Sequence, residues 1–168
     1  MIRVRKTKQA FAENNENINQ QLLDDQYGKC CYCERLVDTD FQIEHLQSQH
    51  NHPELINDWD NLYLACSYCN SHKSDSFDNI MAPSKYNVEE IIKQEDDSKN
   101  SKVIFSSNNE DEKVKQTIKL LSLLFNGKDG LRKTKANIFY KSYRDENELL
   151  PTPYCRLSLW RRGERSGY

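Results

Sequence analysis

Six cysteines occur in this chain of 168 residues, and four of them form two Cys-x-x-Cys pairs. Cys30 and Cys33 make up the first pair, and Cys66 and Cys69 the second. Zinc prefers four tetrahedral ligands at about 2.3 Å for sulfur, and two such pairs supply four thiolates. A site of four cysteines has no open position for water or substrate. We therefore predict one structural zinc ion that closes a long loop and anchors the fold.

The alternative for these cysteines is a set of unconnected buried thiols, which two correctly spaced pairs disfavour. Cys31 and Cys155 remain, and we interpret them as small apolar residues, because buried free cysteines are common. A lesser possibility is that Cys31 replaces Cys30 as a ligand. The two-residue spacing to Cys33 favours Cys30.

Polar side chains near the cysteine pairs suit the cutting of a phosphodiester bond. This reaction needs a base that activates water, a cation that takes charge from the phosphate, and protonation of the leaving oxygen. His45 is the natural base, because imidazole titrates near neutrality. Glu44 and Asn70 offer oxygen ligands suited to a catalytic Mg²⁺ or Mn²⁺ ion.

Each of these residues also has a structural interpretation. A lone histidine on a strand is usually structural, and neighbours on an ideal strand point to opposite faces. Glu44 and His45 therefore share a metal site only where the strand ends or kinks, which leaves Glu44 open as a ligand. The remaining histidines are interpreted as solvated loop or surface residues, although the first two could line a substrate groove: His50, His52 and His72.

Short elements are predicted to position these residues. A helix is expected over about 14–27, with Ile18, Leu22, Leu23 and Tyr27 on one face and Gly28 as its C-cap. Alternation of apolar and polar residues predicts a strand at 41–44, and 62–65 reads as a second strand. A helix is expected from about Asn70. Strand, loop, strand and helix start is the order of a ββα-metal finger.

The second half of the chain is predicted to be mainly helical. Residues 95–112 are mostly polar and acidic, which predicts an insertion or mobile loop with a possible strand at 103–105. Apolar residues recur at helical spacing from Val114 to Phe125, and Gly127 follows as a stop. Two further segments are predicted, a helix over 131–144 and an aromatic, arginine-rich tail from Pro151.

Charge is distributed unevenly around a net value of −2. Residues 28–80 carry three Lys/Arg and nine Asp/Glu, a balance of −6, whereas residues 127–168 carry ten and five, a balance of +5. An acidic catalytic segment repels a polyanion, since phosphate contacts supply most non-specific affinity. Substrate binding must then come from the basic C-terminal region, from a partner, or from both. No apolar run approaches a membrane span and no secretory signal is recognisable, so a cytoplasmic location is expected.

Residues 28–75 resemble the HNH nuclease superfamily. The motifs match in order: paired knuckles, Glu-His, Asn-Leu before the second knuckle and Cys-Asn-x-x-Lys after it. The resemblance implies that His45 is the base and that Asn70 is a metal ligand, in the HNN form of the motif. It also implies that Asn61 orders the loop that carries the base. Lys73 is expected to contact phosphate or to hold the helix.

A closer resemblance extends over most of the chain, to the PtuB-type HNH subunit of Septu and retron anti-phage systems. It implies an ATPase subunit of PtuA type as partner and DNA as substrate. Members commonly have proline a few residues after the histidine, whereas Gln-Ser-Gln stands at 47–49 here. The resemblance rests on residues 22–35, 43–45, 58–62, 65–70 and 117–123.

The sequence thus predicts an α+β fold, a zinc-stapled ββα-metal finger embedded in a mostly helical single domain. Its parts are an N-terminal helical segment at 1–27, the nuclease core at 28–80 and a helical extension with a basic tail at 81–168. The predicted function is metal-dependent endonucleolytic cleavage of DNA within a defence complex. The alternatives are a non-catalytic zinc-stapled binding module and an HNH-type ribonuclease.

The predicted helix over 114–125 is apolar over more than one side, since Leu120, Leu123 and Leu124 widen its face. One interpretation is that residues 10–27 and 131–150 cover it within the chain. The other is that part of it, or the aromatic and arginine-rich tail, docks on the ATPase.

Overall fold

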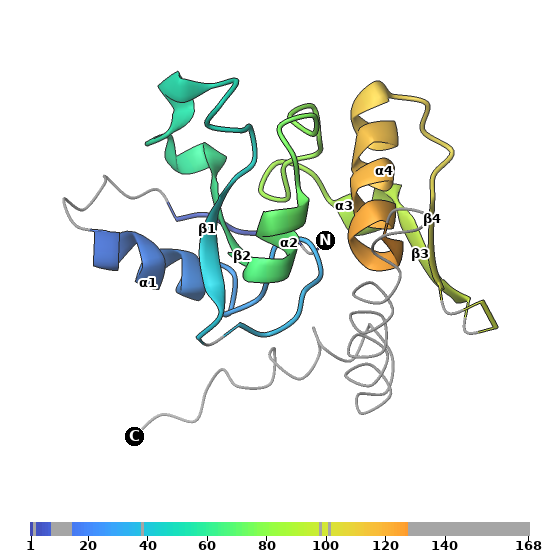
Figure 1. Ribbon diagram of the computed structural model, residues 1–168, viewed down its shortest axis with the longest axis horizontal. Helices are drawn as coiled ribbons and strands as arrows, with labels where there is room; N and C mark the ends of the chain where they lie inside the picture. The colour runs from blue at the N-terminus through green and yellow to red at the C-terminus, as the bar shows by residue number, and fades with distance from the viewer. Residues whose placement is uncertain (2, 8–14, 38, 98, 101, 128–168) are drawn as a thin grey trace.

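A computed structural model describes residues 1, 3–7, 15–37, 39–97, 99–100 and 102–127 (Figure 1). Within them the chain forms four α-helices and two small antiparallel sheets, which confirms the predicted α+β class. None of the described helices is long and apolar enough to cross a membrane. The predicted helix over 131–144, Cys155 and the tail from Pro151 lie outside the described residues.

The first sheet is a hairpin of β1 (Phe41–His45) and β2 (Leu62–Cys66). The strands pair antiparallel, with Phe41 opposite Cys66 and His45 opposite Leu62, so both predicted strands are confirmed. Every residue of β2 is buried. Figure 1 shows why: α1 (Asn15–Asp25) lies on one side of the hairpin and α2 (Ser67–His72) on the other.

Helix α1 ends in a turn that differs from the predicted cap. The N–H of Gly28 donates to the carbonyl of Leu23 at 2.7 Å, and the N–H of Tyr27 donates to that of Asp24 at 3.2 Å. This is the Schellman pattern, in which the first residue past the helix is left-handed. Tyr27 occupies that position with φ of +54°, so its side chain is 58 % exposed. Its predicted place on the apolar face is wrong.

Helix α2 begins at Ser67, three residues before the predicted start at Asn70. Cys66 is its N-cap, and the Cys66 sulfur accepts the N–H of Cys69 at 3.5 Å. The second cysteine pair therefore lies in the first turn of the helix. One sulfur of this pair caps the helix while both remain available to a metal.

The segment predicted as a mobile loop contains a second hairpin. Strand β3 (Lys93–Asp97) pairs antiparallel with β4 (Lys102–Ser106), which confirms the possible strand and corrects the loop around it. Val103 and Phe105 on β4 are buried, whereas most of β3 is exposed and entirely polar. The pairing partner rather than an apolar pattern holds β3, so its sequence gives no strand signal.

Helix α4 (Glu112–Asn126) confirms the predicted helix, and Gly127 follows it with φ of +77°. The described residues supply part of its cover. Phe125 meets Phe105 of the β3–β4 hairpin edge to face at 5.2 Å, and the Tyr68 hydroxyl donates to the carbonyl of Leu124 at 3.1 Å. The β3–β4 hairpin and α2 therefore cover part of this helix. Of the two ranges predicted to cover it, 131–150 and the first part of 10–27 lie outside the described residues.

Candidate metal centre and active site

The four predicted zinc ligands come together at the end of the β1–β2 hairpin. Their sulfur atoms all lie within 4.8 Å of one another, and all four side chains are buried. The sulfurs of Cys33 and Cys66 are 3.9 Å apart. A tetrahedron with bonds of about 2.3 Å has edges of about 3.8 Å, so this spacing fits four thiolates around one zinc ion. A set of unconnected thiols does not explain such a cluster.

Cys31 is not part of this cluster. Burial raises the pKa of its thiol well above the ordinary value, which keeps it neutral. Burial opposes ionisation of Cys30 as well, but sulfur hydrogen bonds with Cys31 first and then with the other three cysteines of the cluster lower the pKa of Cys30 well below its ordinary value. The geometry therefore favours Cys30 over Cys31 as the ligand, as the spacing predicted.

Gln26 holds the first cysteine pair against the hairpin, a role that its sequence context does not indicate. Its side-chain amide donates to the carbonyls of Lys29 and Leu64 at 2.9 Å, and its oxygen accepts the N–H of Leu64 at 2.8 Å. The N–H of Cys31 also donates to the Leu64 carbonyl at 2.8 Å. Gln26 is fully buried, and these hydrogen bonds hold the turn that carries the first cysteine pair against β2.

His45 is the last residue of β1, and its imidazole is half-buried. Nε2 lies 3.0 Å from the carbonyl of Ile56, an acceptor only, so Nε2 carries the proton and Nδ1 keeps a lone pair. The amide nitrogen of Gln49 lies 2.9 Å from Nδ1 and 3.1 Å from Nε2, and in this tautomer only Nδ1 can accept from it. Burial is the main cause that lowers the pKa of His45. The imidazole is therefore neutral at pH 7 and able to accept a proton.

Asn61 joins the two segments that surround this histidine. Its Oδ1 accepts the N–H of Gln47 at 2.8 Å, and its Nδ2 donates to the carbonyls of Gln47 and Leu55 at 3.0 and 3.3 Å. Gln47 follows His45 by two residues, and Leu55 precedes Ile56, which holds the imidazole. This buried amide therefore fixes both segments beside His45, and its role in ordering a loop around a catalytic base stays a prediction.

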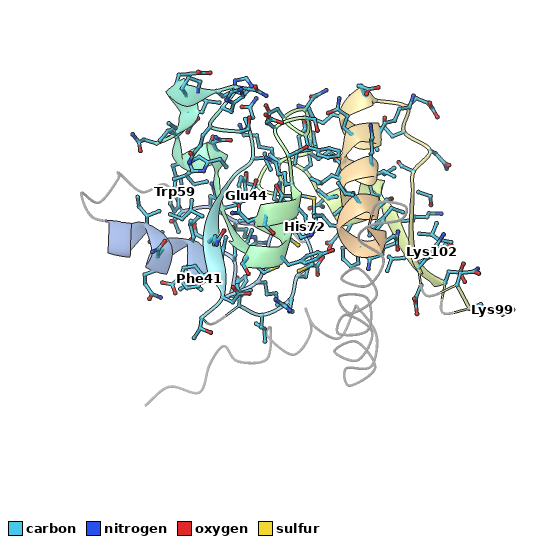
Figure 2. All side chains as sticks on the ribbon, in the orientation of Figure 1. Phe41, Glu44, Trp59, His72, Lys99 and Lys102 are labelled. Atoms are coloured by element: carbon cyan, nitrogen blue, oxygen red, sulfur yellow. The ribbon has the colours of Figure 1, made fainter. Side chains whose placement is uncertain are left out.

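Glu44 points away from its neighbour His45, as strand geometry requires. It is 3 % exposed and lies between β1 and α2 (Figure 2). Its Oε1 accepts from the Tyr32 hydroxyl at 3.2 Å and pairs with the ammonium of Lys73 at 3.1 Å. Lys73 also donates to the His45 carbonyl at 2.9 Å. Of the two roles predicted for Lys73, the described contacts are those of a residue that holds the helix end against the strand.

Glu44 and Asn70 were predicted to hold the catalytic cation, because carboxylate and amide oxygens are the type of ligand that Mg²⁺ prefers. Gln42 and Glu44 share one face of β1, where the former accepts from the Asn70 amide and the latter from Lys73. The amide nitrogen of Asn70 is therefore engaged, which leaves Oδ1 for a cation. Oε1 of Glu44 is taken by Tyr32 and Lys73, which leaves Oε2. The contacts described for these two side chains are with protein groups and Glu44 is buried, so a cation shared by Glu44 and Asn70 stays a prediction.

The pKa of Glu44 yields a testable prediction. Burial raises it from 4.5 to about 7, and Lys73 opposes that rise. The folded chain therefore binds more protons than the unfolded chain between these values. The Glu44 contribution to stability is greatest at low pH and falls as pH rises from about 4.5 to about 7. Lys73→Met removes the opposing cation, so we expect the pKa of Glu44 to rise further and the loss of stability to extend above pH 7.

A carbon-detected NMR titration of the Glu44 carboxyl, together with denaturant unfolding at several pH values, measures this change. Lys85→Met is the matched control, because Lys85 pairs with Asp60 at 3.6 Å on the surface, where both side chains are largely exposed. It should leave the pKa of Glu44 in place. An unchanged Glu44 pKa in Lys73→Met would show that the cation has no influence on the carboxyl.

The other three histidines make no contact with His45 among the described hydrogen bonds. His72 hydrogen-bonds to the carbonyl of Tyr68 at 2.7 Å and stacks on its ring, which is a structural role on α2. His52 lies 3.3 Å from the carboxylate of Glu54. His50 is exposed. Their predicted interpretation as loop or surface residues agrees with these positions.

Comparison with curated proteins finds no match, and comparison with solved structures finds none either. A comparison with family models does find one, over the stretch that holds both cysteine pairs, His45, Asn61 and Asn70. Residues 30–76 match the family model described as HNH endonuclease, and this match supports placing the segment with the four clustered cysteines in the HNH superfamily.

Proposed function

We propose that the protein is a metal-dependent endonuclease that hydrolyses phosphodiester bonds in DNA. The observation that carries this proposal is the setting of His45. Its imidazole is neutral, oriented by the carbonyl of Ile56 and placed in the segment that matches the HNH model. The four-cysteine site is closed and takes no part in the reaction.

In the proposed reaction, Nδ1 of His45 accepts a proton from the attacking water, which takes the place of the Gln49 amide. The bond between the Ile56 carbonyl and Nε2–H stabilises the imidazolium that results. Asn61 keeps the two segments around the imidazole in place. A Mg²⁺ or Mn²⁺ ion, for which Asn70 and Glu44 are the proposed ligands, would take up charge from the phosphate and lower the barrier to departure of the leaving oxygen.

The proposal extends to a cytoplasmic defence complex with an ATPase subunit of PtuA type. It rests on the sequence resemblance and on charge, because residues 28–80 carry a balance of −6 and need help to approach a polyanion. Leu120 and Leu124 of α4 are fully buried within the chain, so they are not part of a docking surface. A contact through α4 would use the partly buried Ile118 and Leu123.

The test is cleavage of matched DNA and RNA substrates with added Mg²⁺ or Mn²⁺, with and without the candidate ATPase. We expect cleavage of DNA that requires the added ion and that the ATPase accelerates. Asn70→Ala should raise the ion concentration required, because it removes a ligand. Preferential cleavage of RNA would identify a ribonuclease instead. Binding without cleavage under every condition would favour a zinc-stapled binding module.

A further inference from the structure

The loop from Leu46 to His52 joins β1 to the short 3-10 helix Pro53–Leu55 and carries Gln49 to His45. It contains no proline or glycine and no regular element, so hydrogen bonds have to fix its course. Asn61 fixes its start through Gln47. The part around Gln49 needs a second anchor.

Asp78 provides that anchor with both carboxylate oxygens. Oδ1 accepts the N–H of Ser48 at 2.7 Å, while Oδ2 accepts the Ser48 hydroxyl at 3.0 Å and the Asn51 amide at 2.6 Å. The imidazole Nε2 of His52 lies 3.8 Å from Oδ2. Burial opposes ionisation of Asp78, but these hydrogen bonds outweigh it and lower the pKa of the carboxyl. Charge-assisted bonds of this kind are the stronger class.

The position of Asp78 is itself well fixed. Its side chain is 15 % exposed, and the buried residues Phe77 and Ile80 hold the backbone on either side. The N–H of Phe77 also donates to the Ser74 carbonyl at 3.1 Å. The backbone that carries the Asp78 carboxylate is therefore held in place by its buried neighbours. It lies just beyond residues 30–76, which match the family model.

We infer that Asp78 is a positioning residue for the reaction, holding Ser48 and Asn51 so that the loop keeps its course beside the His45 imidazole. The two bonded residues stand on either side of Gln49, one and two positions away, so they confine its backbone. This inference rests on the proposed function, since it gives Asp78 a role only if His45 is the base. If the Asp78 hydrogen bonds served stability alone, their loss would lower the free energy of unfolding and leave the cleavage rate of the folded protein unchanged.

The experiment compares Asp78→Ala, Asp78→Asn and the control Thr117→Val in the full-length protein, loaded with zinc. Thr117 is buried on α4, where its hydroxyl accepts the N–H of Met81 at 2.8 Å, so its loss destabilises a region apart from the loop. Steady-state cleavage of DNA gives kcat and KM, and hydrogen exchange at the Ser48 amide reports the state of the loop.

Asp78→Ala is expected to speed exchange at Ser48 and to lower kcat by about 10- to 100-fold with little change in KM, the effect of a misplaced catalytic group. Asp78→Asn keeps an acceptor for the Ser48 N–H and should fall between wild type and Asp78→Ala. Thr117→Val should lower the Tm and leave kcat in place.

Faster exchange at Ser48 with a wild-type kcat in Asp78→Ala would overturn the inference. So would unchanged exchange, or a loss of rate matched by Thr117→Val. Failure of the proposed function gives a different result, since wild-type protein then cuts neither substrate at any ion concentration. In that case the positioning role falls with it, while Ser48 exchange still reports whether Asp78 anchors the loop.

Discussion

Cys66→Ser is expected to unfold the protein rather than to weaken it slightly. Cys66 belongs to the buried cluster of four sulfurs, ends β2 and caps α2 through the Cys69 N–H. A serine hydroxyl is a poor substitute for a thiolate, so the substitution removes one ligand of four. Structural zinc contributes about 10–16 kcal/mol in small zinc domains, and whole domains are stable by only about 5–15 kcal/mol. Loss of the ion therefore removes most of the folding free energy.

Zinc content by elemental analysis and unfolding by circular dichroism test this result. Wild type should contain one zinc per chain, and a strong chelator should unfold it. Cys31→Ser is the matched control, because it makes the same change at a buried cysteine outside the cluster. It should retain its zinc and lose only about 1–3 kcal/mol, the cost of burying a hydroxyl. A folded Cys66→Ser protein, or wild type with clearly less than one zinc, would contradict the structural role.

The features that the sequence predicted correctly are those encoded locally. The alternation of apolar and polar residues predicted β1, and apolar residues at helical spacing predicted α4. The spacing of the two cysteine pairs predicted which four cysteines cluster. A zinc site brings two distant segments of the chain together. The sequence predicts this contact, since cysteine pairs at fixed spacing are recognisable without knowledge of the fold. The predicted roles of Glu44 and Asn70 came from the chemistry of their oxygens and, for Asn70, from the family resemblance, and they stay predictions.

The features that sequence reasoning missed depend on contacts between distant residues. Gln26 bonds to Leu64, Lys73 to Glu44 and Asp78 to Ser48, with about 30 residues or more between the partners in each case. A polar residue whose partner is so distant looks like any surface residue in a single sequence. Strand β3 was missed for a related reason, because pairing with β4 holds a strand with no apolar residue.

His45→Ala is expected to lower the rate of cleavage by about 10²–10⁴ while the protein keeps its zinc and its fold. The imidazole is bonded to the Ile56 carbonyl and the Gln49 amide at the surface end of β1 and lies outside the sulfur cluster. Its removal therefore takes away the base without removing a zinc ligand. His50→Ala is the matched control, since it deletes an exposed imidazole from the same loop and should cut at the wild-type rate.

The pH dependence separates loss of the base from loss of substrate binding. Only neutral His45 accepts a proton, so the wild-type rate should rise with pH through the pKa of His45 and then level off. Burial lowers that pKa, which places the rise below the ordinary value of 6.5. His45→Ala should abolish this rise along with most of the rate, whereas a binding defect would raise KM and keep the rise. If His45→Ala cuts as fast as wild type, or keeps the same pH profile, another group is the base.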